Sequence, residues 1–288
     1  MSDLVAFAKY EAAGNDFLIV EDTGVGPALS ADEVRSLCER WFGVGADGLI
    51  EMARGTGAPF RMTLTNADGT GAAISGNGLR CLAAYLHDRG RLESATVHVE
   101  SGAGVHRVEV QVADGRVVGA TVGMGAPQFA RAAIPMRGAA WETFLGQPFD
   151  IGGGLTVTAS AVSMGNPHLV LFLDEDPERF HVEHIGPALE RHELFPEGVN
   201  VEFARVQDEG TVAVRVWERG VGETLACGTG ACAVAVAAGE AGLAPGRVAV
   251  RFRGGTLTAE RCDDGTVLLG GPVRHVFDGT VDRAELCA

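Results

Sequence analysis

The stretch NADGTGAAISGNGLRC, residues 66–81, occurs a second time in altered form as ERGVGETLACGTGACA, residues 218–233. Each copy holds a polar residue, Asn66 or Glu218, then a loop, then a Gly-x-Gly turn that opens a helix of small residues. The residue before the turn is Ser75 in the first copy and Cys227 in the second. The chain therefore contains the same motif twice, but only the second copy has a sulfur atom directly before the turn.

The repeat extends beyond these two stretches. A Gly-Asn pair leads into an apolar strand at AAGNDFLIV, residues 12–20, and again at SMGNPHLVLF, residues 163–172. The offset is 151 residues from Asn15 to Asn166 and 152 residues both from Asn66 to Glu218 and from Ser75 to Cys227. A nearly constant offset along the chain indicates two halves of one design.

Most of each half reads as strands. Apolar and polar residues alternate in segments such as residues 211–218 and 247–261, and Asp-Gly or Gly-Gly turns separate them. Each half has one prominent helix, residues 78–90 and 230–242, and the second is apolar on nearly all sides, so we expect it to be enclosed by protein. The pattern predicts an α+β fold with two pseudo-symmetric domains. We expect the first to comprise residues 1–126 plus 275–288 and the second residues 127–274, with the crossover near residues 123–129.

Composition excludes several classes of protein. Hydrophobic residues make up 46% of the 288 residues, enough for substantial cores. A net charge of −15 disfavours nucleic-acid partners, which need a basic face. No apolar run is long enough to span a bilayer and the N-terminus lacks signal-peptide order, so we expect a soluble, cytoplasmic protein with no membrane partner. Lys9 is the single lysine and no phosphate-binding loop follows it, which argues against pyridoxal phosphate.

The six cysteines show no CxxC spacing, so neither a disulfide framework nor a metal site is expected. Cys38 lies in a predicted helix that a capping box at Ser30 and Glu33 begins, and it should be buried. Cys232 lies inside the second small-residue helix and should serve packing, and Cys287 is a tail residue with no expected role.

Cys227 differs because it directly precedes a helix. The first amides of a helix lack internal partners, and the helix dipole favours an anion there, most simply a carboxylate. The same field lowers the pKa of a thiol, so Cys227 is predicted to be activated. Two such helix ends facing each other across an interdomain cleft would present one base to each face of a bound carbon. That geometry moves a proton across a stereocentre without a metal or an organic cofactor.

Eight motifs occur in order along essentially the whole chain: GNDF, GVGADG, NADG, SGNGLRC, MGNPH, GVNVEF, WERGVGET and ACGTGACA. Together they resemble the diaminopimelate epimerase family, isomerases that interconvert LL- and meso-2,6-diaminopimelate in lysine and peptidoglycan biosynthesis without pyridoxal phosphate. The resemblance implies a β-barrel-like sheet around a central helix in each domain and two catalytic cysteines at the domain interface. It also implies a small amino-acid substrate, no cofactor and a possible homodimer.

The resemblance implies a set of site residues. The positions with catalytic roles are Cys227, Ser75, His168 and Glu218, where His168 stands near a catalytic sulfur and tunes its pKa. The positions that contact the substrate are Asn15, Asn66, Gly76, Asn77, Asn166, Asn200, Glu218, Arg219, Gly228 and Thr229. Arg219 suits a carboxylate and Glu218 an ammonium.

Ser75 departs from the family pattern, which has cysteine there. A serine hydroxyl is far less acidic than a thiol and needs a strong neighbouring base to act as one. The change is explained by an engineered substitution, by a natural variant that uses a Ser/Cys pair on this or another amino acid, or by a homologue that has lost catalysis and binds amino acids. We expect an epimerase that Ser75 impairs, with the Ser/Cys-pair enzyme and the non-catalytic binding protein as the alternatives.

Two further interpretations remain open from the residues alone. The stretch GTGACA, residues 228–233, matches a dinucleotide-binding glycine pattern, but no run of βαβ units surrounds it. A related isomerase acting on cyclic amino acids is the other, although Glu218 and Arg219 suit a substrate with a second amino-acid head. We interpret Asp47 and Asp68, each followed by glycine, as turn residues and Asp16 and Arg80 as structural.

Overall fold

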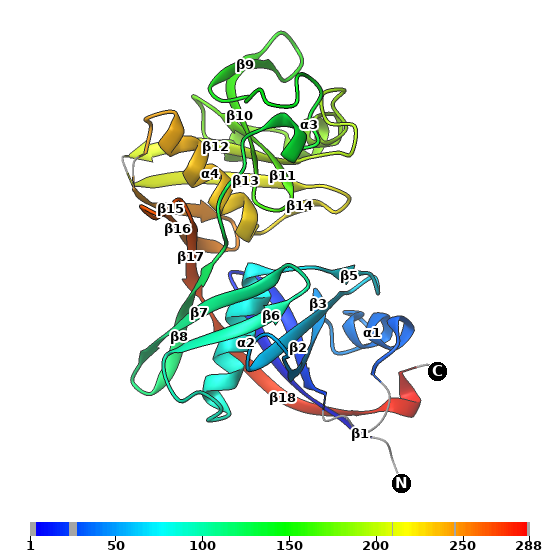
Figure 1. Ribbon diagram of the computed structural model, residues 1–288. Helices are drawn as coiled ribbons and strands as arrows, with labels where there is room; N and C mark the ends of the chain where they lie inside the picture. The colour runs from blue at the N-terminus through cyan, green and yellow to red at the C-terminus, as the bar shows by residue number, and fades with distance from the viewer. Residues whose placement is uncertain (1–3, 23–27, 209, 245, 287–288) are drawn as a thin grey trace. The chain divides into compact units, whose positions relative to one another are not determined.

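The computed structural model describes residues 4–22, 28–208, 210–244 and 246–286, so Cys287 lies outside the described residues (Figure 1). The chain divides into two compact units, Met1–Val122 with Gly271–Ala288 and Gly123–Gly270. These limits fall near residues 126 and 275, the boundaries expected from the sequence. The division into domains of residues 1–126 plus 275–288 and 127–274 stays a prediction.

The first unit comprises β1 (Leu4–Ala12), β2 (Asn15–Glu21), α1 (Ala31–Cys38), β3 (Gly48–Arg54), β4 (Phe60–Asn66), β5 (Gly71–Ala72), α2 (Gly76–Asp88), β6 (Thr96–Ser101), β7 (Gly104–Ala113), β8 (Arg116–Gly123), β18 (Arg274–Asp282) and η3 (Arg283–Glu285). Strand β1 pairs antiparallel with β18 and β2, and β2 pairs parallel with β3. Strand β4 pairs antiparallel with β3 and β5 and parallel with β6, and β6, β7 and β8 form an antiparallel meander.

The second unit comprises η1 (Arg131–Ala133), β9 (Gln147–Asp150), β10 (Thr156–Ser163), β11 (Pro167–Phe172), η2 (Pro177–Arg179), α3 (Val182–Glu190), β12 (Asn200–Asp208), β13 (Thr211–Glu218), β14 (Gly222–Thr224), α4 (Gly228–Glu240), β15 (Arg247–Phe252), β16 (Gly255–Arg261) and β17 (Val267–Pro272). Its pairings repeat those of the first unit: β10 with β9 and β11, β11 parallel with β12, β13 with β12 and β14, β13 parallel with β15, and β15, β16 and β17 as a meander.

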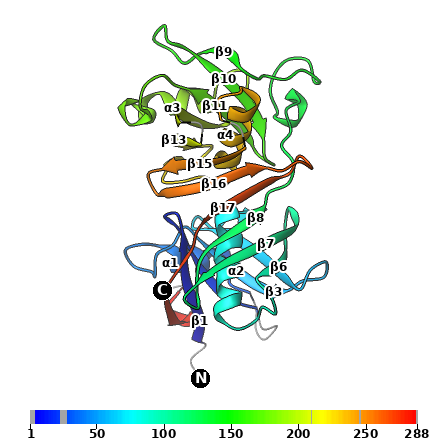
Figure 2. The same cartoon turned by 90° about the vertical axis from the view of Figure 1, so that its left-hand side faces the viewer.

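Each unit encloses one helix. Helix α2 packs against β1, β2, β3, β4, β7 and β18, and α4 packs against β10, β11, β12, β15 and β16. Figure 2 shows both helices among the strands of their own units. Residues Gly230 to Ala238 of α4 are all buried, as its apolar sequence predicted. The α+β class and the repeated plan are therefore confirmed. Mainly antiparallel pairing also makes the dinucleotide-binding interpretation wrong, because that fold needs consecutive parallel strands.

The two helices begin alike. Both are 13 residues long, and their N-cap residues have nearly the same backbone angles, φ −141° and ψ 121° at Ser75 and φ −128° and ψ 121° at Cys227. The Gly78 amide donates to Ser75 Oγ at 3.0 Å, and the Gly230 amide donates to Cys227 Sγ at 3.4 Å. Each side chain therefore satisfies one of the free amides of its helix.

The smaller helix α1 has the capping box that its sequence predicted. Ser30 Oγ accepts from the Glu33 amide at 3.3 Å, and the Glu33 carboxylate accepts from the Ser30 amide at 2.7 Å. Cys38 is buried, also as predicted. The same Glu33 carboxylate accepts from Arg283 at 2.5 and 2.9 Å, so the end of the chain is fixed to α1.

Glu33 should stabilise the protein in a pH-dependent way. The hydrogen bonds from Arg283 lower the pKa of Glu33 from 4.5 to about 2. Because the folded pKa lies below the unfolded one, the stabilisation is complete above pH 4.5 and is lost as the pH falls toward 2. We expect Glu33→Gln to lower the free energy of unfolding by about 2 kcal/mol at pH 7 and by much less at pH 3, measured by urea denaturation.

The matched control is Glu109→Gln, which removes an exposed carboxylate paired with Arg107 at 2.7 Å. It should change stability little at either pH, because exposed ion pairs contribute little. An equal loss in the two variants would contradict a specific role for Glu33.

Candidate active site

Cys227 is the centre of a polar cluster in the second unit. Its side chain lies at the start of α4 and the residue is 6% exposed. Three groups contact the sulfur: the Gly230 amide at 3.4 Å, Thr229 Oγ1 at 3.5 Å and the carboxylate of Glu218. The thiol is therefore held between a helix N-terminus and an acid.

The prediction that Cys227 has a lowered pKa is wrong for this arrangement. Burial raises the pKa of the Cys227 thiol well above its ordinary value, and the nearby carboxylates of Glu218 and Glu202 raise it further. Hydrogen bonds from Thr229 and the Gly230 amide act in the opposite direction but are the smaller effects. The sequence argument considered the helix dipole and left out desolvation and two acidic neighbours. The thiol therefore carries its proton near neutral pH.

Glu218 lies at the end of β13, where β14 returns toward the helix. Burial raises the pKa of Glu218, while hydrogen bonds to Thr224 and Cys227 and the proximity of His168 lower it in part. The Thr224 hydroxyl donates to Glu218 Oε1 and fixes that oxygen. A carboxylate that contacts a thiol can exchange a proton with it.

His168 on β11 is fully buried and forms part of a hydrogen-bonded row. Its Nδ1 lies 2.6 Å from Glu202 Oε1, and its Nε2 lies 2.9 Å from Asn166 Oδ1. Asn166 Nδ2 in turn donates to Thr229 Oγ1 at 3.2 Å. The predicted residues His168, Asn166 and Thr229 are therefore connected to Cys227.

Asn200 and Arg219 are also brought to this end of the unit. Asn200 Nδ2 donates to the Pro167 carbonyl at 3.1 Å, and Asn200 Oδ1 accepts from the Arg219 amide at 2.8 Å. Asn200 therefore fixes the strand ends that carry His168 and Arg219. Arg219 itself is exposed, with Nη1 on the Glu197 carbonyl at 3.1 Å, so its other nitrogens can reach an anion.

The first unit has a corresponding row at the start of α2. Asn77 Nδ2 donates to Asn15 Oδ1 at 3.2 Å, and Asn15 Nδ2 donates to Asp47 Oδ2 at 2.6 Å. Arg80, fully buried, donates to Asn77 Oδ1. Among the described residues of this unit, no carboxylate or imidazole is hydrogen-bonded to the Ser75 hydroxyl, which accepts from the Gly78 amide.

Asn66 lies at the end of β4, as Glu218 does at the end of β13. Its Nδ2 donates to Thr70 Oγ1 at 3.0 Å, and Thr70 also bonds Asp68. Asp68 thus has the turn role predicted for it. Gly76 is buried at the first position of α2, and Gly228 is half-buried at the first position of α4.

Sequence reasoning missed three residues of these rows. Asp47 was interpreted as a turn residue, yet it holds Asn15, and Arg80 was interpreted as structural, yet it orients Asn77. Glu202 was not considered, although it pairs with His168. The available signal was its position: a glutamate in the apolar strand GVNVEF must be buried and therefore needs a partner.

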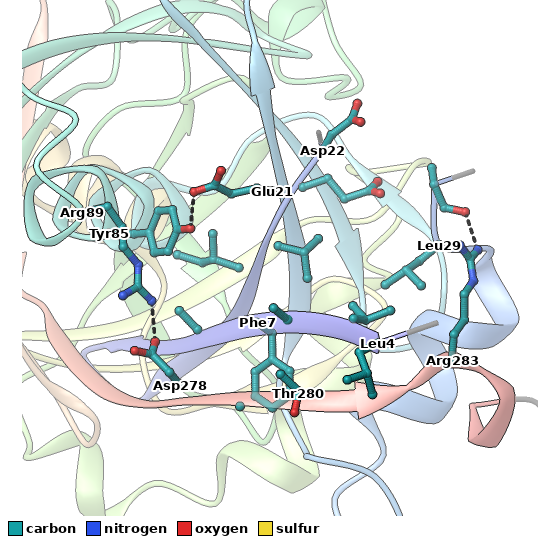
Figure 3. Close-up of a pocket in the computed structure, with 18 residues that line it drawn as sticks. Leu4, Phe7, Glu21, Asp22, Leu29, Tyr85, Arg89, Asp278, Thr280 and Arg283 are labelled. Carbon is teal, nitrogen blue, oxygen red and sulfur yellow. Dashed lines mark hydrogen bonds and ion pairs between the residues drawn. The ribbon is translucent and has the colours of Figure 1, made fainter. Parts of the chain in front are cut away.

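One cavity of the first unit lies elsewhere. It has a volume of about 850 Å³ and is bordered by β1, β2 and β18, and none of the predicted site residues lines it. In Figure 3, two polar pairs lie on its wall: Tyr85 donates to Glu21 at 2.6 Å, and Arg89 donates to Asp278 at 2.6 Å. Because none of the residues expected to carry the chemistry lines this cavity, it is not assigned to the chemistry.

An exposed cluster at the start of α3 brings together His181, Glu183 and His184. The Arg215 guanidinium lies 3.5 Å from the Glu183 carboxylate and already supplies a positive charge there. This cluster is therefore a poor cation site. Within the described part of the chain, no helix has the length and apolar character needed to cross a membrane.

Comparison with known proteins shows what this chain is similar to. The family profile described as diaminopimelate epimerase matches residues 7–130 and 160–276. The chain is 46% identical to the diaminopimelate epimerase of Desulforudis audaxviator, over 96% of this chain and 99% of that protein. It is 38% identical to the diaminopimelate epimerase of Leptospira biflexa, again over 96% of this chain and 99% of that protein.

Solved structures with low sequence identity share the fold. A phenazine biosynthesis protein of the PhzF family from Bacillus anthracis superposes with a TM-score of 0.68 at 17% identity, covering 97% of this chain and 99% of that one. A probable proline racemase from Agrobacterium radiobacter gives a TM-score of 0.70 at 15% identity, covering 96% and 92%. At these identities the likeness concerns the fold alone.

The electrostatics of Cys227 can be tested by alkylation. We expect iodoacetamide to modify Cys227 slowly at pH 8, and Glu218→Gln to increase the rate about tenfold, because one negative charge that raises the thiol pKa is removed. The rate would be measured by mass spectrometry of the Cys227 peptide, with the half-buried Cys262 as the internal reference. Glu240→Gln, at the far end of α4, is the control. A slower rate in Glu218→Gln would mean that Glu218 acts mainly as a base for the thiol.

Proposed function

The chain belongs to the diaminopimelate epimerase family, and we propose that it interconverts LL- and meso-2,6-diaminopimelate, with a turnover that Ser75 reduces. The observation that carries the proposal is the cluster at the start of α4. There a buried thiol caps a helix N-terminus and contacts a carboxylate of raised pKa, with His168 and Glu202 nearby. A thiol and a carboxylate in contact, with an imidazole nearby, are the groups that an acid–base catalyst needs.

The helix N-terminus supports the binding of the reacting amino acid. The amides of Gly228 and Thr229 stand at the first two positions of α4, where free N–H groups and the helix dipole favour a carboxylate. Hydrogen bonds to that carboxylate stabilise the negative charge that develops when the α-proton leaves. Arg219 and Glu218 supply a cation and an anion for the amino-acid groups of the substrate.

Cys227 moves one proton in each turnover. The protonated thiol can donate its proton to the α-carbanion on one face, which forms a C–H bond and leaves a thiolate. In the reverse direction the thiolate takes the α-proton and the C–H bond breaks. The family resemblance gives the role of the second base to the position of Ser75, and among the described residues of the first unit no base is hydrogen-bonded to its hydroxyl to remove the proton. The proposal therefore includes slow inversion.

We also propose that the protein works in the cytoplasm without nucleic-acid partners, since its net charge of −15 repels phosphate backbones. A homodimer is part of the same proposal and rests on the family resemblance. The second candidate function is that of an amino-acid-binding homologue without catalysis, which the serine at position 75 supports.

Mass spectrometry of diaminopimelate incubated in D₂O tests the proposal. Through Cys227 alone, we expect deuterium to enter one epimer with little net inversion. In Ser75→Cys, a second thiol should raise the rate of epimerisation by about 10³-fold or more. Cys227→Ser in the same background is the control and should remove most of the exchange. An unchanged rate in Ser75→Cys would overturn the proposal that Ser75 limits turnover, and the absence of exchange in both chains would favour the binding protein.

A further inference from the structure

His168 and Glu202 form a charged pair with no access to solvent. Both side chains are 0% exposed and lie 2.6 Å apart. Among the described residues, the second carboxylate oxygen, Oε2, has no hydrogen-bond partner. A buried ion pair loses much of its Coulomb energy to desolvation, and an unpaired buried oxygen adds to that cost. Stability therefore does not explain why His168 and Glu202 are buried together.

The repeat shows that the fold does not require this pair. Phe17 in β2 pairs with Gly48 in β3, just as His168 in β11 pairs with Asn200 in β12. Two residues further along their strands lie Ile50 and Glu202, respectively. The first unit thus has Phe17 and Ile50 where the second has His168 and Glu202.

The surroundings of the two positions match. The nearest atom to a Cβ built on Gly78 would be Ile50 Cδ1, at 3.3 Å, and the nearest to a Cβ built on Gly230 would be Glu202 Oε1, at 2.7 Å. Both glycines lie three residues after the helix N-cap. The same pocket is therefore filled by an apolar side chain behind Ser75 and by a carboxylate behind Cys227.

The donor and the acceptor of each hydrogen bond between Glu202 and Cys227 can be assigned. A carboxylate only accepts, so His168 Nδ1 donates to Glu202. Asn166 donates through Nδ2 to Thr229, so its Oδ1 faces His168 Nε2 and accepts from it. With its oxygen accepting from Asn166, the Thr229 hydroxyl is free to donate to Cys227 Sγ. This arrangement requires a proton on both nitrogens of His168.

We propose that Glu202 is a positioning residue that keeps His168 doubly protonated and so directs the Thr229 hydroxyl toward Cys227 as a donor. If His168 were neutral, with no proton on Nε2, the Asn166 amide would rotate so that its Nδ2 donates to Nε2. The Thr229 hydroxyl would then donate to Asn166 Oδ1, and the Cys227 thiol would become the donor to Thr229 Oγ1. The donor contact from Thr229 opposes in part the rise in the Cys227 pKa that burial and the two carboxylates cause. The inference deepens the proposed acid–base function and rests on it only for its catalytic meaning.

The titratable groups around His168 come from three elements. Glu202 on β12 is bonded to it, Glu218 on β13 interacts with it electrostatically, and Cys227 precedes α4. Glu218 also favours a positive charge on His168. The test must therefore remove Glu202 alone and leave Glu218 in place.

Nitrogen-15 NMR of histidine-labelled full-length protein at pH 7.5, without substrate, reads the charge state of His168 directly. We expect two ring N–H signals from His168 in the parent chain and a single one in Glu202→Gln, with ring nitrogen shifts of a neutral tautomer. His168→Phe identifies the signals. Glu240→Gln removes a carboxylate that accepts from Arg261 at the other end of α4 and should leave both signals in place.

Glu202→Ile introduces the residue found at the equivalent position of the first unit, so it gives a second variant should Glu202→Gln fold poorly. It should also show a single ring N–H. A neutral His168 in the parent chain, or a doubly protonated His168 in a folded variant without Glu202, would overturn the inference. The measurement needs no turnover, so it stands apart from a failure of the proposed epimerase activity.

Discussion

The hydrogen bond from a helix amide to the side chain before it, Gly78 to Ser75 and Gly230 to Cys227, determines much of this structure. A helix inside a barrel-like sheet ends among strand loops, and its first amides need partners. A small polar side chain supplies one partner and leaves the next amides available to a ligand. The same bond that completes the helix therefore places a hydroxyl or a thiol where a carboxylate can bind.

Much of the fold could be predicted from the sequence because local patterns, such as turn glycines and apolar runs, occur in both halves. Gly14 and Gly165, with φ of 84° and 94°, allow the two tight turns that precede Asn15 and Asn166. The apolar run of α4 predicted its burial correctly. The parallel pairs β2–β3 and β11–β12 could not be predicted, because they join segments separated by α1 and α3. Such pairing depends on tertiary packing and not on local pattern.

The sequence predicted which residues form the site but not the pKa of its thiol. Motifs placed Cys227, Glu218, His168 and Asn166 together, and the structure connects them. The pKa of the thiol depends on burial and on Glu202, which comes from another strand, and neither follows from the order of residues near Cys227. Comparing the two halves reveals such residues, because Glu202 in the second half stands where the first half has the apolar Ile50.

Strand β18 has a consequence for how the protein is made. It pairs with β1 from Leu4 opposite Asp282, so the first unit is closed by a strand that is synthesised after the whole of the second unit. The second unit comes from one uninterrupted stretch, Gly123–Gly270. During synthesis the strands of the second unit can all pair while the first unit still lacks strand β18. The second unit is therefore synthesised later but can complete its folding first. The unit that carries Ser75 keeps β1 unpaired on one side until β18 has been synthesised.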